Sequence, residues 1–258
     1  MPGRHRKQWA SAPRGYFAWE AAGLRWLAEA RPTGGAAVVE VLGHGEHHLD
    51  LAAVVPATPT TEAAEALGRG LAATHAAGAP AFGSGPPDWV GDGWLGPLGE
   101  PLPLPLGAWT SWGEHWARGR IRPLLPEARR RHAVDAAGLA LLERLAERVA
   151  GGAFDTGEPP ARLHGDLWSG NVLWSGTGAV LIDPSAHGGS READLALLTL
   201  FGAPHLERVL AAYDEAVPLA DGWRDRVALH QVHPLLLHAV LFGGPYGAQA
   251  VAAARHYA

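Results

Sequence analysis

The chain has no cysteine among its 258 residues and only one lysine, Lys7, beside twenty arginines. The absence of cysteine excludes disulfides, thiolate nucleophiles and cysteine-ligated zinc. The sequence also lacks any apolar run of the roughly 18 residues that a membrane span requires. No apolar run follows the basic first residues, so we do not expect a secretory signal. A cytoplasmic protein is the simplest interpretation.

The sequence also lacks a net positive charge. The net charge is −5 with neutral histidines, which argues against nucleic acid as the main partner and would suit a cationic amine substrate. With 47% hydrophobic and 18% charged residues, the chain has enough apolar material for a folded core. Its length allows two modest lobes around a cleft. The oligomeric state is left open.

The periodicity of apolar residues changes near residue 56. Residues 1–55 mix one helix with strands, and Pro56 to Pro59 predict a hinge. The elements expected before the hinge are a helix over Phe17–Ala30 and strands over Ala36–Leu42 and Leu49–Val55, joined by a turn at 43–46.

Residues 56–258 predict mainly helices. We expect residues 80–106, rich in proline and glycine, to form a long loop. The expected helices are Thr61–Ala77 with Thr61 as its cap, one from Ser111 to near Pro123, one containing 139–149, and then 190–201, 205–217, 223–242 with an interruption at Pro234, and 246–256. The fold class predicted is therefore α+β, with a small N-lobe (1–55) that contains strands and a larger, mainly helical C-lobe (56–258).

The residues most suited to chemistry lie between Arg162 and Ala196. His164-Gly165-Asp166 is followed by Asn171, five residues after the aspartate, and then by an apolar run and Asp183. This order is the H-x-D-x-x-x-x-N arrangement of kinase catalytic loops, followed by a second, metal-binding aspartate. We expect Asp166 to accept the proton of a substrate hydroxyl and His164 to stabilise the loop.

The spacing between Asn171 and Asp183 predicts a β-hairpin. Val172–Trp174 and Val180–Ile182 are apolar and flank the turn residues 175–178. Symmetric pairing would place 172 opposite 182 and Asn171 opposite Asp183, with Cα atoms roughly 4.5–5.5 Å apart. An amide oxygen and a carboxylate at that spacing can share one Mg²⁺. The alternative is that these residues only form turns, as Asn and Asp often do.

A phosphoryl transferase also needs a cation on the nucleotide phosphates. Lys7 precedes the first expected helix, and Glu20 lies near the start of that helix. A lysine from a strand paired with a glutamate from the first helix is the arrangement found in kinases. The alternative for Lys7 is a solvated lysine near the chain terminus.

The histidines form two groups that could suggest metal binding. For His44, His47 and His48 with Asp50 we favour the polar tip of a strand–turn–strand, which explains these residues without a metal ion. The second group lies on one expected helix at a spacing of three to five residues, and we expect it in the core or along a cleft: His230, His233 and His238.

At these residues the sequence resembles the fructosamine kinase (ketosamine-3-kinase) family, relatives of aminoglycoside and choline kinases. The resemblance covers nearly the whole chain and rests on the segments 17–29, 67–78, 163–171, 181–202 and 229–247. It implies a protein-kinase-like two-lobe fold and ATP- and Mg²⁺-dependent phosphorylation of the 3-hydroxyl of a ketosamine. The phosphorylated adduct then breaks down and frees the amine, which is deglycation. Pro184 after Asp183, in place of Phe-Gly, points away from protein kinases.

Carried over to this chain, the resemblance implies Asp166 as the catalytic residue and Asn171 and Asp183 as the metal ligands. It implies Lys7 and Glu20 as the paired residues of the nucleotide lobe. The other implied residues are Val54 and Val55 at the hinge, where adenine would bond to backbone groups, Trp168, His187 and Glu192 on the substrate side, and Asp194 as a brace of the catalytic loop.

One departure concerns the residues before Lys7. The family pattern has strands and a Gly-rich phosphate-covering loop ahead of this lysine, but only six residues precede it here, fewer than the roughly 8 that two strands and a turn require. We therefore expect a truncated N-lobe. Three alternatives stay open: an aminoglycoside- or choline-type kinase, a catalytically impaired nucleotide-binding pseudokinase, and a metal-dependent hydrolase that uses Asp166 and Asp183.

Overall fold

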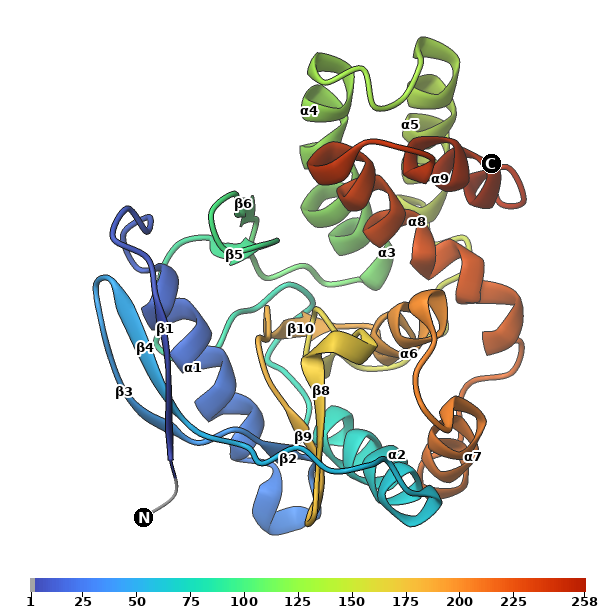
Figure 1. The fold of residues 1–258 in the computed structure, drawn as a ribbon. Coiled ribbons are helices and arrows are strands. Elements are labelled where there is room, and N and C mark those ends of the chain that lie inside the picture. Colours follow the sequence, from blue (N-terminus) through green and yellow to red (C-terminus); the bar gives the residue numbers. More distant parts are fainter. Residues whose placement is uncertain (1–2) are drawn as a thin grey trace.

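The N-terminal part of the chain is a small antiparallel sheet with one helix packed against it. The computed structural model describes residues 3–258. Strands β1 (Arg4–Gln8), β4 (His48–Ala52) and β3 (Val41–Gly45) form the sheet in that order, and α1 (Tyr16–Ala28) lies beside it (Figure 1). Phe17 and Leu24 of α1 are buried together with Leu49 of β4. Burial of this apolar face fixes the helix on the sheet.

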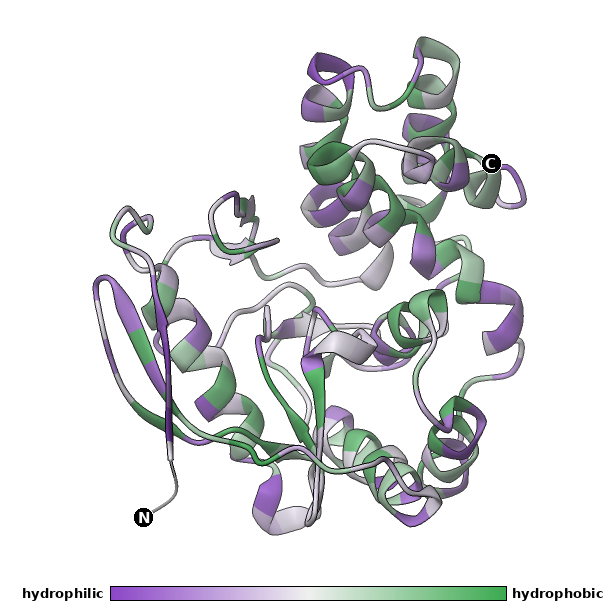
Figure 2. Ribbon diagram, viewed as in Figure 1, coloured by the Kyte–Doolittle hydropathy of each residue, from purple (hydrophilic) through white to green (hydrophobic). Residues whose placement is uncertain are grey.

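β1 lies at one edge of this sheet and is hydrophilic (Figure 2). The Arg6 side chain donates two hydrogen bonds of 2.6 Å to Asp50 on the neighbouring strand. Charged side chains on an edge discourage pairing with other chains. Lys7 is the one residue of β1 that is partly buried, because its side chain lies on the face of the strand that meets α1.

Two of the strand predictions before the hinge are wrong in their bounds. The strand expected over Ala36–Leu42 is two separate strands, β2 (Ala37–Val38) and β3, and the one expected to reach Val55 ends at Ala52. Within the β3–β4 pairing a bulge lies between Val41 and Gly43, and Gly45 pairs with His48. The turn therefore lies at Glu46 and His47 and not at 43–46.

A second sheet connects the first 55 residues to the rest of the chain. Its order is β2-β9-β8, with β2 parallel to β9 (Gly178–Leu181) and β9 antiparallel to β8 (Val172–Ser175). Pro56 also forms an isolated bridge with Ser175. The division at 55/56 thus remains a prediction, since the pairing of β2 with β9 crosses it. The short strands β7 (Ala161–Leu163) and β10 (His187–Gly189) pair nearby.

The register predicted for the β8–β9 hairpin is wrong by one residue. Val172 lies opposite Leu181, and Ser175 opposite Gly178, so the turn contains only two residues. The Ser175 hydroxyl accepts a hydrogen bond from the Thr177 N–H (3.2 Å) and donates one to the Gly178 carbonyl (2.8 Å). These local bonds favour the tighter turn. Asn171 consequently lies opposite Ile182 and not opposite Asp183. Its backbone carbonyl accepts a hydrogen bond of 3.1 Å from the Ile182 N–H.

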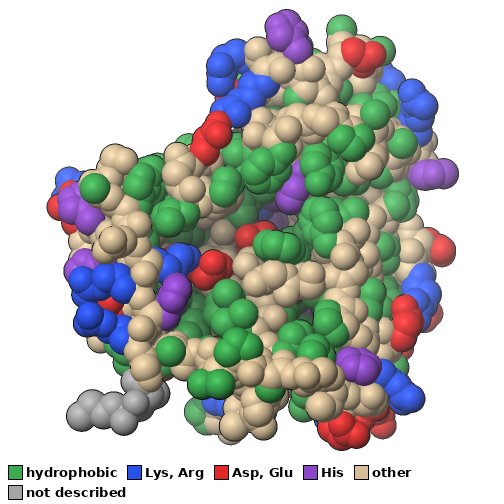
Figure 3. Space-filling view, viewed as in Figure 1, with side chains coloured by type: hydrophobic (Ala, Val, Ile, Leu, Met, Phe, Trp, Pro, Cys, Tyr) green, Lys and Arg blue, Asp and Glu red, His purple; other side chains and the backbone are tan. Residues whose placement is uncertain are grey.

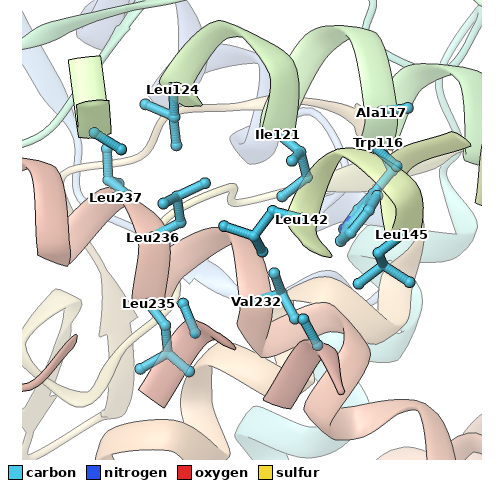
Figure 4. Packing of buried hydrophobic residues seen from close by; sticks show 14 of the residues in the cluster. Trp116, Ala117, Ile121, Leu124, Leu142, Leu145, Val232, Leu235, Leu236 and Leu237 are labelled. Atoms are coloured by element: carbon cyan, nitrogen blue, oxygen red, sulfur yellow. The ribbon is translucent and has the colours of Figure 1, made fainter. Parts of the chain in front are cut away.

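The remaining residues form two groups of helices. In one group α2 packs against α7 over a core shared with β8 and β9; in the other, α8 contacts α9 and α6. Figure 4 shows Ile121, Leu142 and Val232 pointing toward one another in the second core. The bounds are α2 (Thr61–Ala76), α3 (Trp112–His115), α4 (Leu125–Arg130), α5 (Ala136–Ala150), α6 (Arg191–Phe201), α7 (Leu206–Ala216), α8 (Trp223–Phe242), α9 (Tyr246–Ala254), a π-helix η2 (Trp116–Ile121) and 3₁₀ turns η1 (Arg31–Thr33), η3 (Arg122–Leu124) and η4 (Ser169–Asn171).

Four predictions in the helical part need correction. The 80–106 segment contains a hairpin of β5 (Gly93–Leu95) and β6 (Leu102–Leu104). The helical path that starts at Ser111 continues past Pro123, because η3 places this proline in its first turn, where it is tolerated. α8 runs through Pro234 without a break, and Thr60, not Thr61, caps α2. No helix in residues 3–258 combines the length and apolar character needed to span a bilayer.

Replacement of Gly68 tests the close packing of α2 on α7. A Cβ at this position would lie 2.2 Å from the carbonyl oxygen of Val209, a backbone atom of α7. We expect Gly68→Ala to lower the free energy of unfolding by about 2 kcal/mol, because the overlap outweighs the gain of up to about 1 kcal/mol in helix propensity. Urea denaturation measures the change, with Arg69→Ala, an exposed neighbour, as control. Equal stability of the two variants would contradict this packing.

Candidate active site

Six of the residues predicted from the sequence line one cavity. The cavity has a volume of about 270 Å³ and is bordered by β1, α1, the β5–β6 segment, α8 and the loop over residues 164–171, which we call the catalytic loop after the predicted motif. Figure 3 shows a hollow in the middle of this face, with acidic side chains inside it and hydrophobic side chains around it. The six residues are Lys7, Glu20, Asp166, Trp168, Asn171 and Asp183.

Lys7 binds two carboxylates at once. Its Nζ lies 2.9 and 2.8 Å from the two oxygens of Glu20 and 3.1 Å from Oδ1 of Asp183. Burial opposes the charge, but the two carboxylates outweigh it and hold the pKa of Lys7 above its usual value. The ammonium group is therefore a fixed positive charge next to the catalytic loop.

The catalytic loop depends on Gly165. Its φ of +81° is in the left-handed region, and a Cβ there would lie 2.1 Å from the carbonyl oxygen of Ser185. Only glycine meets both conditions without strain. The sharp turn at Gly165 directs the N–H groups of His164 and Gly165 to the same side of the loop, where both meet Asp194.

Asp194, on α6, holds the loop through its backbone. Its carboxylate accepts hydrogen bonds from the N–H groups of His164 (2.7 Å) and Gly165 (2.9 Å), and His75 Nε2 lies 3.1 Å away. Burial opposes ionisation, but the contact with His75 and the bond from Gly165 hold the pKa of Asp194 below its usual value. His164 adds a contact of 2.8 Å between Nε2 and the Ile182 carbonyl. The loop is thus tied to both α6 and the hairpin.

Asp166 and Asn171 lie together at the end of this loop. Asn171 Nδ2 donates to the backbone carbonyl of Asp166 (2.8 Å) and to its Oδ2 (3.0 Å). Burial raises the pKa of Asp166 to about 7, against the hydrogen bond from Asn171, and the negative charge of Asp183 adds to the rise. A carboxyl group with a pKa in this range can accept and release a proton near neutral pH.

Asp183 reaches the cavity through an unusual backbone conformation. Its φ is +54°, a left-handed geometry that Asp tolerates better than most residues and that often marks functional positions. Asn171 Nδ2 lies 3.4 Å from the Asp183 carbonyl. The Asn171 side chain therefore contacts the backbone of Asp183, and both residues line the cavity through this turn and not through direct pairing across the hairpin.

The side chains of Asn171 and Asp183 supply the hard oxygen donors that Mg²⁺ prefers. This ion commonly uses one or two protein carboxylates together with substrate phosphates, so an amide and a carboxylate at the cavity wall fit it. Within residues 3–258 no group of three or more His, Asp or Glu side chains is placed to hold a metal ion by itself. The histidines near Asp50 accordingly form no such group.

Besides His164 and Asp194, which hold the loop from behind, four of the predicted site residues lie outside this cavity wall. Val55 is 78% exposed, and Val54 packs on the cluster around Tyr16. His187 is buried, with Nδ1 2.8 Å from the Ser185 carbonyl, and lines a smaller neighbouring cavity. Glu192 is buried in an ion pair with Arg226 (2.6 Å), and His230 Nε2 lies 3.2 Å from its carboxylate. Their contributions to a site stay predictions.

Sequence reasoning missed the part of the site that comes from residues 80–106. The Trp94 carbonyl accepts hydrogen bonds from Trp19 Nε1 (2.9 Å) and from the Ser185 hydroxyl (3.0 Å). These bonds fix β5 between α1 and the segment after Asp183. The unusual length of the predicted loop indicated a functional segment, but nothing in its sequence identified the carbonyl that anchors it.

Comparison with known proteins shows consistent similarity along the chain. The family model described as fructosamine kinase matches residues 7–257. A Thermus thermophilus protein named as a probable ketoamine kinase is 34% identical over 91% of this chain and 79% of its own. The crystal structure of a Thermobifida fusca YX-ER1 protein, provisionally described as a fructosamine-3-kinase, has 46% identity and a TM-score of 0.89, covering 98% of this chain and 85% of that one.

More distant structures share the fold alone. The gentamicin–APH(2″)-IIa complex superposes with a TM-score of 0.61 at 10% identity, over 98% of this chain and 84% of that one. The predicted α+β fold of the phosphotransferase type is therefore confirmed. In three curated proteins named as probable ketoamine kinases the aligned stretch covers 49%, 38% and 58% of their own length, so this chain spans about half of these relatives.

The hydrogen bonds to Asp194 predict a pH-dependent contribution to stability. We expect Asp194→Asn to lower the free energy of unfolding by about 2 kcal/mol at neutral pH, because bonds to a buried carboxylate are stronger than those to an amide. The folded-state pKa of Asp194 is depressed, so its contribution is present above the unfolded value of 3.8 and is lost as the pH falls through the folded value.

The difference between wild type and Asp194→Asn should thus be constant above about pH 5 and shrink below about pH 4. Chemical denaturation across this range measures it. Glu207→Gln, which changes an exposed carboxylate on α7, is the control. A difference that does not vary with pH would show that the charge of Asp194 contributes nothing.

Proposed function

The chain belongs to the fructosamine kinase family, and we propose that it is a cytoplasmic, ATP-dependent kinase of ketosamines. The proposed acceptor is the 3-hydroxyl group of a ketosamine such as fructosamine or ribulosamine. Breakdown of the phosphorylated adduct would free the amine, so the proposed physiological role is deglycation. The partners of this enzyme are then small molecules, namely ATP and a glycated amine.

One observation carries the proposal: a lysine, two aspartates and an asparagine from β1, the catalytic loop and the end of the hairpin line a single cavity. Phosphoryl transfer requires a cation on the phosphates, oxygen donors for Mg²⁺ and a carboxylate at the attacking hydroxyl. Lys7, the pair Asn171 and Asp183, and Asp166 meet these three requirements in turn. The ion pair of Lys7 with Glu20 keeps the cation oriented toward the cavity.

The proposed transfer uses few protein groups. The acceptor hydroxyl oxygen forms a bond to the γ-phosphorus of ATP while the bond from that phosphorus to the β–γ bridging oxygen breaks, and ADP leaves. The hydroxyl proton passes to Asp166, which burial has given a pKa of about 7. Asn171 holds the Asp166 carboxylate with a 3.0 Å hydrogen bond, which orients it for this step.

Mg²⁺, when bound, neutralises the charge of the nucleotide phosphates, and we assign its protein ligands to Asn171 and Asp183. On the acceptor side we assign Trp168, which is 41% exposed at the cavity wall and packs edge-on against Phe201. The backbone near Val54 and Val55 stays our proposed contact for adenine. Since His187 and Glu192 are both buried, we propose that they shape the acceptor site by supporting the residues that line it.

ADP release from Mg-ATP tests the proposed activity. The acceptors are ribulosamine, erythrulosamine and fructosamine beside aminoglycosides and choline. We expect turnover with ketosamines, and we expect Asp166→Asn to reduce kcat at least about 100-fold because proton acceptance is lost, with ATP binding retained. Asp221→Asn, at an exposed carboxylate, is the matched control.

The other outcomes of this assay are distinct. Turnover only with aminoglycosides or choline would assign another acceptor to the same fold. ATP binding without transfer to any acceptor would favour a nucleotide-binding pseudokinase. Full turnover in Asp166→Asn would remove Asp166 from the mechanism.

Substitution of Asp183 tests the metal assignment separately. We expect Asp183→Ala to abolish the increase in ATP affinity that Mg²⁺ produces, because the carboxylate ligand is gone. Titration calorimetry with and without Mg²⁺ measures this increase. Glu20→Gln, which loosens Lys7 but leaves both proposed ligands, should weaken binding with and without Mg²⁺ alike. An unchanged Mg²⁺ dependence in Asp183→Ala would show that another residue holds the ion.

A further inference from the structure

A second cavity adjoins the first at the catalytic aspartate. We call the cavity described above the outer cavity and this one the inner cavity. The inner cavity has a volume of about 60 Å³, and Asp166 and His238 belong to the walls of both. A single water needs only about 10–15 Å³, so the inner cavity can hold a small polar group. Lys7 and Asp183 line only the outer cavity, which places the inner cavity on the acceptor side of Asp166.

The wall of the inner cavity carries all the buried side-chain nitrogen and oxygen atoms that lack a hydrogen-bond partner in residues 3–258. These atoms are both ring nitrogens of His115, Nε1 of Trp116, Nη2 of Arg120 and Nδ1 of His230. Buried polar groups in folded proteins nearly always have partners. Their concentration around one space therefore indicates a binding site and not scattered defects of packing.

Arg120 is the cation of this wall. Its side chain is nearly fully buried, with the residue 4% exposed, and Nη1 donates to the carbonyls of Pro105 (3.0 Å) and Gly119 (2.8 Å). Burial lowers the pKa of Arg120 to about 9, and no carboxylate in the described chain offsets this effect. The guanidinium is thus still protonated at neutral pH. A buried charge is normally paired, because desolvation without a counter-charge is costly.

The histidines around Arg120 are neutral. Burial, together with the positive charge of Arg120, lowers the pKa values of His115, His187 and His233. Each neutral ring can donate one N–H. The acidic residue deepest in this wall, Asp194, is already bound by His75 and by backbone N–H groups. The other carboxyl group of the wall, Asp166, lies where the two cavities meet and accepts a hydrogen bond from Asn171. Beyond these two acidic residues the inner cavity offers a cation and several donors.

We propose that the inner cavity binds an anionic oxygen group, carboxylate or phosphate, of the acceptor molecule. Arg120 Nη2 pairs with this group, and Trp116 Nε1 and a ring N–H of His115 donate to it. The reacting hydroxyl of the same molecule then lies at Asp166, where the two cavities meet. This inference rests on the proposed kinase activity and narrows its acceptors to anionic ketosamines.

The two chemical sources of the anion can be separated with matched acceptors. The ketosamine of glycine carries a carboxylate that the ketosamine of glycinamide lacks, at nearly the same size. A ketosamine with a terminal phosphate ester compares in the same way with its unphosphorylated parent. We measure the dissociation constant of each by titration calorimetry and kcat/KM by ADP release. We expect the anionic member of one pair to bind at least about 30-fold more tightly, as for other buried charge pairs.

Variants of Arg120 then test the assignment of the cation. We expect Arg120→Gln to abolish this preference by raising the dissociation constant of the anionic acceptor about 30-fold or more, with little change for the neutral one. Arg120→Lys keeps the charge and should retain part of the preference. Arg118→Gln, at an exposed arginine of the same helical segment, should leave both acceptors unchanged.

Each outcome decides the inference. Equal binding of the charged and neutral members of both pairs by the wild-type protein would overturn it, even if Arg120→Gln failed to fold. A preference that survives in a folded Arg120→Gln would also overturn it. Tighter binding of an anionic acceptor without any turnover would support the anion site while the proposed kinase activity failed. Turnover of neutral and anionic ketosamines with equal constants would leave the kinase and remove the anion site.

Discussion

The ammonium group of Lys7 connects the N-terminal sheet to the end of the β8–β9 hairpin, and the candidate site depends on that connection. It lies 2.8 Å from Glu20 on α1 and 3.1 Å from Asp183 after β9. Without the cation, the two carboxylates would repel each other. β1 has little apolar surface to fix it, so Lys7 is positioned by its pairing with Leu49 and by these two charges. The same contacts bring the cation to the oxygens proposed to bind Mg²⁺.

The sequence predicted that three polar residues would share one site, but not the hairpin register and backbone conformation that bring them to one cavity. Asp166, Asn171 and Asp183 stand in a fixed order around two apolar runs, and that order implies a hairpin with polar residues at its open end. The register was wrong because side-chain hydrogen bonds of Ser175 set a two-residue turn. If the strand had continued in extended conformation after β9, the shift of one residue in register would have directed the Asp183 side chain to the opposite face of the hairpin. The left-handed conformation of Asp183 compensates for the shift.

Other parts of the site depend on tertiary contacts that no local pattern encodes. Trp94 contributes a backbone carbonyl, and any residue type could supply that group. Arg120 is one of twenty arginines, and arginine side chains are mostly exposed in folded proteins. Its burial follows from the packing of η2 against α5 and α8. Periodicity predicted a helix in each of these segments, although not their continuity at Pro123 and Pro234, and it gave no reason to single out the one arginine that they enclose.

The two cavities use different cations for a chemical reason. Lys7 is a compact point charge, which can sit between two carboxylates and still turn toward phosphate oxygens. Arg120 has a planar fork with one arm, Nη1, fixed by two carbonyls and the other arm directed to a carboxylate or phosphate of fixed geometry. Asp166 lies where these two environments meet. An acceptor held at its anionic end by Arg120 would place its hydroxyl between Asp166 and the nucleotide, which is the alignment that in-line transfer requires.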